Sequence, residues 1–436
     1  MTRVCRSIVP RRRMAGLSLI EMMIALVMAL IVAAGIITVF ASTSSSNKVQ
    51  AQMAALQEEG RFAIQSLRTD LGNANGAYCS NTGGNAGTTT SGLYLDALRS
   101  PTIYANSAIV FPDNTIALPA PGQAYSLPSS IFMRGYGCTV AACTPAGLTG
   151  LAPGVPAMGT VVGSRVKGAD VLSIRYLKPG SGWALVPSTA TGGSYMTTTA
   201  GTTTITLRPL TGEGPASDFT GSLAMLADCS NAQVFAVTNS GGTLTVTGAN
   251  YANPLDITGG AAPRVFDFSN DFQTVTYFLE VVDAGNGHTT GELVRRVNGV
   301  NQPLVRGVER LNFLYGIIDA NGNAEYLTAD QVDSATDAGG KSIACPPGVS
   351  NSGGMPTTGC LWRAVQTIQV NILMDGQTPL YTLTPQEMAY IYSPDTGTTP
   401  TAPSTHPIQP NADQGFPNQL LRREFTALVS LRNYNP

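Results

Sequence analysis

The sequence predicts an α+β protein, in which one long N-terminal helix precedes a large, antiparallel, β-rich globular head. Three observations predict this class. Residues 22–40 carry a single polar side chain, Thr38. Apolar residues then recur every three or four positions from 47 to 71, the spacing of an amphipathic helix. After residue 71, short β-branched runs alternate with clusters of glycine, proline, asparagine and threonine, which is typical of antiparallel strands and turns.

The first half of the helix is expected to cross a membrane. A helix over residues 17–40 is long enough to span the hydrocarbon core of a bilayer. It follows a basic segment, residues 1–16, that contains five arginines and no acidic residue. Because such segments stay on the cytoplasmic side, the C-terminal bulk of the chain is expected on the far side of the membrane.

The second half of the helix, residues 47–71, is expected to pack on the head, residues 72–436. Gly60 would allow another element to approach this helix closely. Gly72 and the pair Asn75–Gly76 are typical of a helix end, whereas the Ser/Thr-rich segment 41–47 predicts a weak point. The predicted buried face consists of Met53, Leu56, Ala63, Ile64, Leu67 and Leu71.

The head is expected to contain at least nine strands and no second long helix. Segments 82–92, 180–201 and 345–360 are polar and glycine-rich, and they are expected to be loops; the Pro/Thr-rich tract 393–413 is expected to be disordered. The clearest strands are Asp170–Leu177, Thr202–Leu207, Ala232–Thr238, Thr243–Thr247, Val275–Val282, Glu292–Val297, Arg310–Ile318, Val365–Leu373 and Phe425–Leu431.

Composition excludes several classes of function. Only 12% of the residues are charged, about half the usual share, and a net charge of −2 argues against a general nucleic-acid binder. The two histidines, His288 and His406, are expected in exposed loops. The chain has no nucleophile elbow, and Gly340-Lys341-Ser342 lacks the first glycine of a phosphate-binding loop. We therefore expect no enzymatic activity and no cofactor.

Cysteine usage indicates an exported protein. One of the seven cysteines, Cys5, lies in the basic segment, which leaves an even number in the rest of the chain. An even count on the oxidising side of a membrane predicts disulfides, although six cysteines allow fifteen pairings. The local pairs Cys138–Cys143 and Cys345–Cys360 would leave Cys79 with Cys229.

Metal binding is not predicted. The cysteines contain no CxxC motif and have no histidine nearby. One segment has oxygen-bearing side chains at alternating positions, as calcium loops do, but its glycine stands at position four rather than six, which favours a plain turn. This weak calcium candidate consists of Asp319, Asn321, Asn323 and Glu325.

The junction between the basic segment and the apolar helix carries a specific motif. An ordinary secretory signal is cleaved after its apolar stretch, but here Gly16 precedes it and Glu21 stands near its start. The run GLSLIE at 16–21 resembles the class III signal of type IV prepilins and pseudopilins, whose usual form is GFTLIE. Leu17 and Ser18 depart mildly from that form.

This resemblance implies processing and assembly. A prepilin peptidase would cleave between Gly16 and Leu17, and the new amine of Leu17 would be methylated. Glu21 would then face the N-terminal amine of a neighbouring subunit, a pairing that makes two charges tolerable in an apolar setting. Loss of residues 1–16 would leave 20 basic residues against 27 acidic ones, so that the mature chain would be acidic.

Four further segments resemble PilW-type minor pilins, in the order found in that family. The resemblance implies a type IV pilin-like fold and a non-enzymatic structural role in the initiation or assembly of type IV pili. These pili are fimbriae that function in cell adhesion. Implied partners are other minor pilins and the major pilin, through their N-terminal helices, together with the prepilin peptidase and the inner-membrane assembly platform. The segments are Leu56–Leu71, Ala227–Thr238, Gly291–Ile317 and Arg423–Asn433.

The implied location is a single pass in the inner membrane with the head in the periplasm, followed by the pilus at the cell surface. Two alternatives remain. The chain could be a large minor pseudopilin of a type II secretion system, which forms a short fibre without an external pilus. It could also be a membrane-anchored exported binding protein or enzyme, which would keep Met1 or be cut beyond Phe40.

Overall fold

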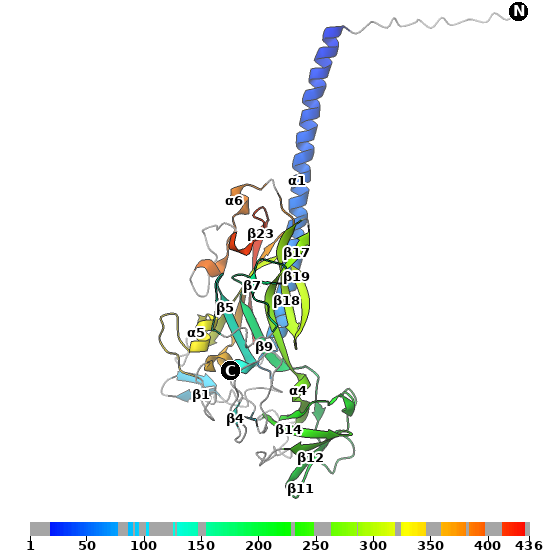
Figure 1. Ribbon diagram of the computed structural model, residues 1–436, viewed down its shortest axis with the longest axis vertical. Helices are drawn as coiled ribbons and strands as arrows, with labels where there is room; N and C mark the ends of the chain where they lie inside the picture. The colour runs from blue at the N-terminus through cyan, green and yellow to red at the C-terminus, as the bar shows by residue number, and fades with distance from the viewer. Residues whose placement is uncertain are drawn as a thin grey trace, which may run out of the picture. The chain divides into compact units, whose positions relative to one another are not determined.

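The computed structural model describes residues 18–76, 86–89, 92–95, 102–103, 125–126, 129–146, 154–227, 232–247, 263–285, 287–318, 324–345, 359–380, 383–396 and 412–431. It confirms the predicted fold class, because one long helix precedes an antiparallel, β-rich region (Figure 1). The chain divides into two compact units, Met1–Ala54 and Ala55–Pro436, and the boundary falls inside the long helix.

Helix α1 runs from Leu19 to Leu71 without interruption. The Ser/Thr-rich segment 41–47 is therefore helical, and the expected weak point does not break the helix. The helical turns on both sides of the segment carry it, because context overrides the low helix propensity of serine and threonine. The helix ends as predicted, with a turn over 72–75 in which Asn75 adopts a positive φ of 63°.

Within the first unit, α1 is apolar and exposed. Every large apolar side chain from Leu19 to Phe40 is more than half exposed. By length and composition, α1 is the one helix among the described residues that could cross a membrane.

Within the second unit, the remainder of α1 buries one face in the main hydrophobic core. The buried positions follow a spacing of three or four residues, which places them on one side of the helix. They match most of the predicted face, in which Ile64 is only half-buried; Met53, the last predicted position of the first unit, is also half-buried. The buried residues are Leu56, Gly60, Ala63, Leu67, Asp70 and Leu71.

Two sheets enclose this core together with α1. Both consist largely of antiparallel pairs, and the longest hairpin joins β17 to β18. The first sheet has the order β19 (Val300–Arg306), β18 (His288–Val297), β17 (Phe272–Gly285), β9 (Val171–Leu177), β5 (Met133–Cys138) and β6 (Cys143–Thr144), with β8 (Arg165–Val166) beside β17 and β7 (Met158–Gly159) beside β8. The second has the order β21 (Ala324–Leu327), β20 (Val308–Ile318), β22 (Thr367–Asp375) and β23 (Arg422–Ser430).

A third sheet has one small core of its own and shares a second with Ile131, Phe132 and Phe272, which lie outside it. Its strands β11, β12 and β14 lie together in the second unit, at the end opposite β23 (Figure 1). Its order is β10 (Trp183–Ala184), β16 (Arg264–Asp267), β13 (Leu223–Ala227), β14 (Ala232–Ser240), β15 (Thr243–Thr247), β12 (Thr202–Thr206) and β11 (Tyr195–Thr199), with β3 (Thr102–Ile103) beside β14 and β4 (Tyr125–Ser126) beside β3. A separate hairpin pairs β1 (Ala86–Thr89) with β2 (Gly92–Leu95).

The short helices of the second unit connect the strands. Among the described residues none after α1 exceeds six residues, which agrees with the prediction of no second long helix. They are α2 (Ser129–Phe132), α4 (Phe268–Asp271), α5 (Ala329–Ser334) and α6 (Pro385–Met388), with 3-10 turns η1 (Ala216–Asp218), η3 (Cys360–Ala364), η4 (Ser393–Thr396) and η5 (Ala412–Gln414).

All nine predicted strands are present, with ends shifted by a few residues. The predictions of loops over 82–92 and 180–201 are wrong in part, because the first segment contains β1 and the start of β2 and the second contains β10 and β11. Threonines of β11 bond to those of β12 across the hairpin, as in Thr197–Thr204 at 2.9 Å, a pairing that stabilises polar strands. The tract 393–413 begins with η4, while its central part and most of segment 345–360 lie outside the described residues.

Candidate assembly interface

The N-terminal turn of α1 holds the one ionisable side chain of the segment 18–40, Glu21. Its Oε2 accepts a hydrogen bond from the backbone N–H of Ser18 at 3.0 Å. The hydroxyl of Ser18 in turn accepts one from the N–H of Ile20 at 3.3 Å. A carboxylate is favoured at a helix N-terminus, where N–H groups are unpaired. Glu21 thus has a partner in its own chain, although its side chain is exposed.

The predicted processing site cannot be placed, because Gly16 and Leu17 lie outside the described residues. What the structure does place next to it is a helix with an apolar surface on all sides from Leu19 to Phe40. A helix that is apolar all round belongs inside a bilayer or inside a larger assembly. This segment therefore has the surface that an interface between helices requires.

Within the second unit, close packing fixes residues 55–71 of α1 against β23. The ring of Phe425, on β23, lies against the backbone of Gly60, and a Cβ atom at this position would collide with it. This confirms the expected role of Gly60 as a point of close approach. A glycine in the middle of a helix weakens it by about 1 kcal/mol relative to alanine. The close approach of Phe425 accounts for glycine at position 60.

A buried polar cluster, which we call the Asp70 cluster, ties the end of α1 to the first sheet. It consists of Asp70, Tyr176, Tyr277 and Arg295. The hydroxyls of Tyr176 and Tyr277 donate to Asp70 at 2.9 and 2.6 Å, and the guanidinium of Arg295 donates from Nε and, at 3.0 Å, from Nη2. Asp70 is only 6% exposed. Four donors thus satisfy one buried carboxylate, as burial of a charge requires.

The pKa values of Tyr176, Tyr277 and Arg295 keep all three side chains in their hydrogen-donating forms. Burial, followed by the nearby carboxylate, raises the pKa of Tyr176 and of Tyr277 far above the usual range, so that both remain hydroxyl donors. The hydrogen bonds to Asp70 raise the pKa of Arg295 despite partial burial. The cluster therefore works as a fixed anion held by one cation and two neutral donors.

The Asp70 cluster was not predicted from the sequence, although the position of Asp70 on α1 indicated a buried carboxylate. Asp70 stands among Ala63, Leu67 and Leu71 on the apolar face of α1. A carboxylate on a buried helix face needs partners. The identity of those partners could not be predicted, because Tyr176, Tyr277 and Arg295 are 106 to 225 residues away in the sequence.

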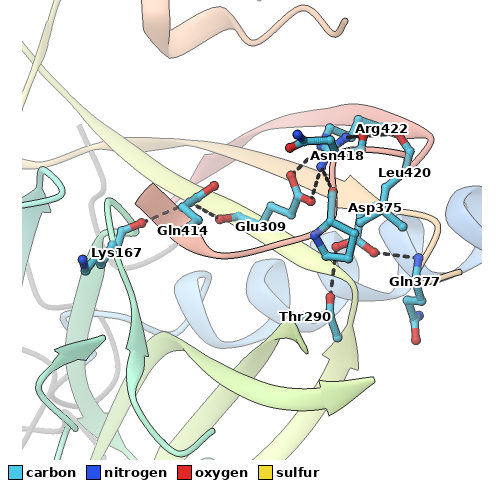
Figure 2. Close-up of polar contacts among 10 residues, drawn as sticks. Lys167, Thr290, Glu309, Asp375, Gln377, Gln414, Asn418, Leu420 and Arg422 are labelled. Atoms are coloured by element: carbon cyan, nitrogen blue, oxygen red, sulfur yellow. Dashed lines mark hydrogen bonds and ion pairs between the residues drawn. The ribbon is translucent and has the colours of Figure 1, made fainter. Parts of the chain in front are cut away.

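A second buried cluster, the Glu309 cluster, joins β20, β22 and β23 (Figure 2). Arg422 binds both carboxylate oxygens of Glu309, at 2.7 and 2.9 Å. Asp375 accepts from the hydroxyl of Thr290 at 2.9 Å and from the N–H of Gln377 at 2.6 Å. The side chain of Gln377 then donates to Glu59 on α1 at 3.0 Å. The cluster is thus a second link between α1 and the sheets.

Two acids and one cation share the Glu309 cluster. Burial and the proximity of Asp375 raise the pKa of Glu309 to about 7, against the opposing effect of Arg422. Burial likewise raises the pKa of Asp375. The guanidinium of Arg422 neutralises the charge of only one carboxylate. Glu309 and Asp375 are therefore expected to share one proton between them. The hydrogen bonds of this cluster stay within the described fold, so we assign it a structural role.

The structure contains both local disulfides considered from the sequence, Cys138–Cys143 and Cys345–Cys360. Cys79 and Cys229 lie outside the described residues. For the calcium candidate, only Glu325 is described; it lies half-buried on β21, whereas Asp319, Asn321 and Asn323 are not described. Within the described part of the chain, no three His, Cys, Asp or Glu side chains gather as a metal site.

The expectation for one histidine needs correction. His288 is not in a loop; it begins β18, pairs with Gly285 of β17 and is half-buried. The glycine-rich turn before it concealed the start of the strand from sequence analysis. His406 lies outside the described residues.

Comparison with known families gives two matches. The model of the family described as type IV pilus-assembly protein W matches residues 276–433. The model of the prokaryotic N-terminal methylation motif matches residues 11–37. The first match takes in Gly291–Ile317 and Arg423–Asn433 but not Leu56–Leu71 or Ala227–Thr238. No curated protein and no solved structure gave a significant match.

Proposed function

Since these two matches place the chain among the type IV pilins of the PilW type, we propose that it is a minor pilin that takes part in the initiation or assembly of type IV pili. The observation on which this proposal rests is the exposed start of α1, whose large side chains from Leu19 to Phe40 are apolar except for Glu21 in the first turn. The methylation motif covers this same segment. A pilin-related chain of this kind is structural, and its surface is built for association.

The proposed sequence of events begins in the membrane. The basic segment 1–16 stays in the cytoplasm, residues 17–40 cross the inner membrane, and the head lies in the periplasm. The prepilin peptidase cuts between Gly16 and Leu17, and Leu17 is methylated. The helix then leaves the lipid and packs among the helices of other pilins, where its apolar surface remains away from water.

Glu21 has a defined role in this proposal. In the single chain its carboxylate accepts from the N–H of Ser18. In the fibre it would pair with the N-terminal amine on Leu17 of a neighbouring subunit. A charge in an apolar setting is stabilised by an opposite charge, so the pairing favours the one axial position of the subunit in which both groups meet.

The experiment that tests the proposed function compares cells with and without the gene for this chain. We expect deletion to abolish most surface fibres, counted per cell by electron microscopy, and to leave protein secretion unchanged. The full chain supplied in trans should restore the fibres. A deletion strain with normal fibres, or one that loses secretion but not fibres, would contradict the proposal and would favour the pseudopilin alternative.

A further inference from the structure

A buried arginine lies directly on one of the two disulfides. Cys138 and Cys143 face each other across the β5–β6 hairpin and are joined by a disulfide. The guanidinium of Arg165, on β8, reaches both sulfur atoms: Nη1 lies 3.4 Å from Sγ of Cys138, and Nη2 lies 3.3 Å from Sγ of Cys143. Arg165 is only 3% exposed.

The fold holds this guanidinium in place. Its Nε donates to the carbonyl of Pro156 at 3.3 Å, and Nη1 donates to that of Ala169 at 3.4 Å. Among the described residues, no carboxylate forms an ion pair with Arg165. The nearby acid, Asp170, instead accepts from the backbone N–H groups of Cys138 and Phe313.

Arg165 remains cationic although it is buried. Burial lowers its pKa to about 10, against the opposing effect of Asp170, so the side chain remains charged at neutral pH. A disulfide sulfur is neutral and a weak acceptor. In the oxidised state this buried cation therefore has only neutral acceptors, and it would gain an anionic one if either sulfur became a thiolate.

We propose that Cys138–Cys143 is a thiol–disulfide exchange site, in which Arg165 stabilises the thiolate released on reduction. The reactant is a dithiol reductant. Its thiolate attacks Sγ of Cys143, which is the less buried of the two residues; a mixed disulfide forms, and Cys138 leaves as a thiolate held by Nη1 of Arg165. The second thiol of the reductant then displaces Cys143, so that the reductant becomes a disulfide and both cysteines are reduced.

The physical basis is the stability of the leaving group. Exchange is faster when the departing thiol has a lower pKa, and a disulfide whose reduced form is stabilised is the more readily reduced. A neighbouring arginine lowers the pKa of a thiol. The second disulfide, Cys345–Cys360, is an internal control, because among the described residues no side chain donates a hydrogen bond to its sulfurs.

The test uses the full chain, oxidised and solubilised in detergent, with dithiothreitol as the probe. Thiols are trapped at intervals by isotopically labelled alkylation, and the reduced fraction of each pair is measured by mass spectrometry. We expect Cys138–Cys143 to be reduced about tenfold faster than Cys345–Cys360 under native conditions. Equal rates, or faster reduction of Cys345–Cys360, would overturn the proposal.

Substitution then tests the role of Arg165. In Arg165→Met, reduction of Cys138–Cys143 should slow at least about fivefold, because the thiolate loses its cation, while Cys345–Cys360 should react at its former rate. Arg208→Met, at an exposed arginine two residues after the end of β12, is the matched control and should change neither rate. An Arg165→Met protein that folds and is reduced as fast as the wild type would sink the proposal.

A further measurement covers the case in which Arg165→Met fails to fold. In the reduced wild-type chain, the rate of alkylation of Cys138, the thiolate that Arg165 is proposed to stabilise, is followed against pH. We expect a midpoint below about 8.5, the ordinary value for a cysteine thiol. A midpoint at or above that value would show that Arg165 does not stabilise the thiolate.

Discussion

Replacing Glu21 with glutamine is expected to leave the helix in the membrane and to reduce incorporation of the chain into pili by at least about tenfold, equivalent to about 1.4 kcal/mol. Glutamine has the same shape and keeps an oxygen that can accept from the N–H of Ser18. It cannot neutralise the amine of a neighbouring subunit, and an unpaired charge in an apolar setting is costly. The effect should therefore appear on assembly and not on insertion.

The measurement is a quantitative immunoblot of the chain in the membrane fraction and in sheared fibres. Met22→Leu is the matched control, since it alters the adjacent exposed side chain without changing charge, and it should be incorporated as the wild type is. Glu21→Leu should behave as Glu21→Gln does. Normal incorporation of both Glu21 variants would contradict the proposed pairing, and loss of the chain from the membrane would show that Glu21 acts on insertion.

Replacing Asp70 with alanine is expected to destabilise the second unit by about 3 kcal/mol or more, the usual effect of removing one partner of a buried ion pair. The substitution leaves the cation of Arg295 without its carboxylate and the hydroxyls of Tyr176 and Tyr277 without their acceptor. An unpaired buried hydroxyl is itself destabilising. The measurement is the free energy of unfolding of the detergent-solubilised chain in urea.

Two variants give this measurement its controls. Gln65→Ala changes an exposed side chain on the same stretch of α1 and should alter stability by less than about 0.5 kcal/mol. In the double variant Asp70→Ala with Arg295→Met, no charge is left unpaired, so the loss should be smaller than the sum of the single losses. An Asp70→Ala protein as stable as the wild type would show that the cluster does not anchor the helix.

Sequence alone predicted the features that depend on local pattern. The apolar stretch ending at Phe40, the buried face with Leu56 and Leu67, and the helix end at Leu71 all follow from periodicity and from turn residues. The nine strands followed from alternation and β-branched content. The role of Gly60 was also predictable, because a glycine on a buried helix face indicates close approach by another element.

The remaining features depend on contacts between residues far apart in the sequence. Asp70 could be recognised as a buried carboxylate, but nothing local indicated that Arg295 pairs with it. Arg165 had no signal at all, since its contact with Cys138 arises from the pairing of β8 with β17 in the same sheet as β5. Strand β11 was missed because its threonines resemble those of a polar loop.

The N-terminal mass of the mature chain, taken from membrane and pilus fractions, shows whether α1 is processed as a pilin helix. The account predicts a chain that begins at Leu17 and carries a methyl group on its amine, as expected for the processed form of the methylation motif at residues 11–37. A chain that begins at Met1, or beyond Phe40, would contradict the assignment of the helix as a pilin assembly helix.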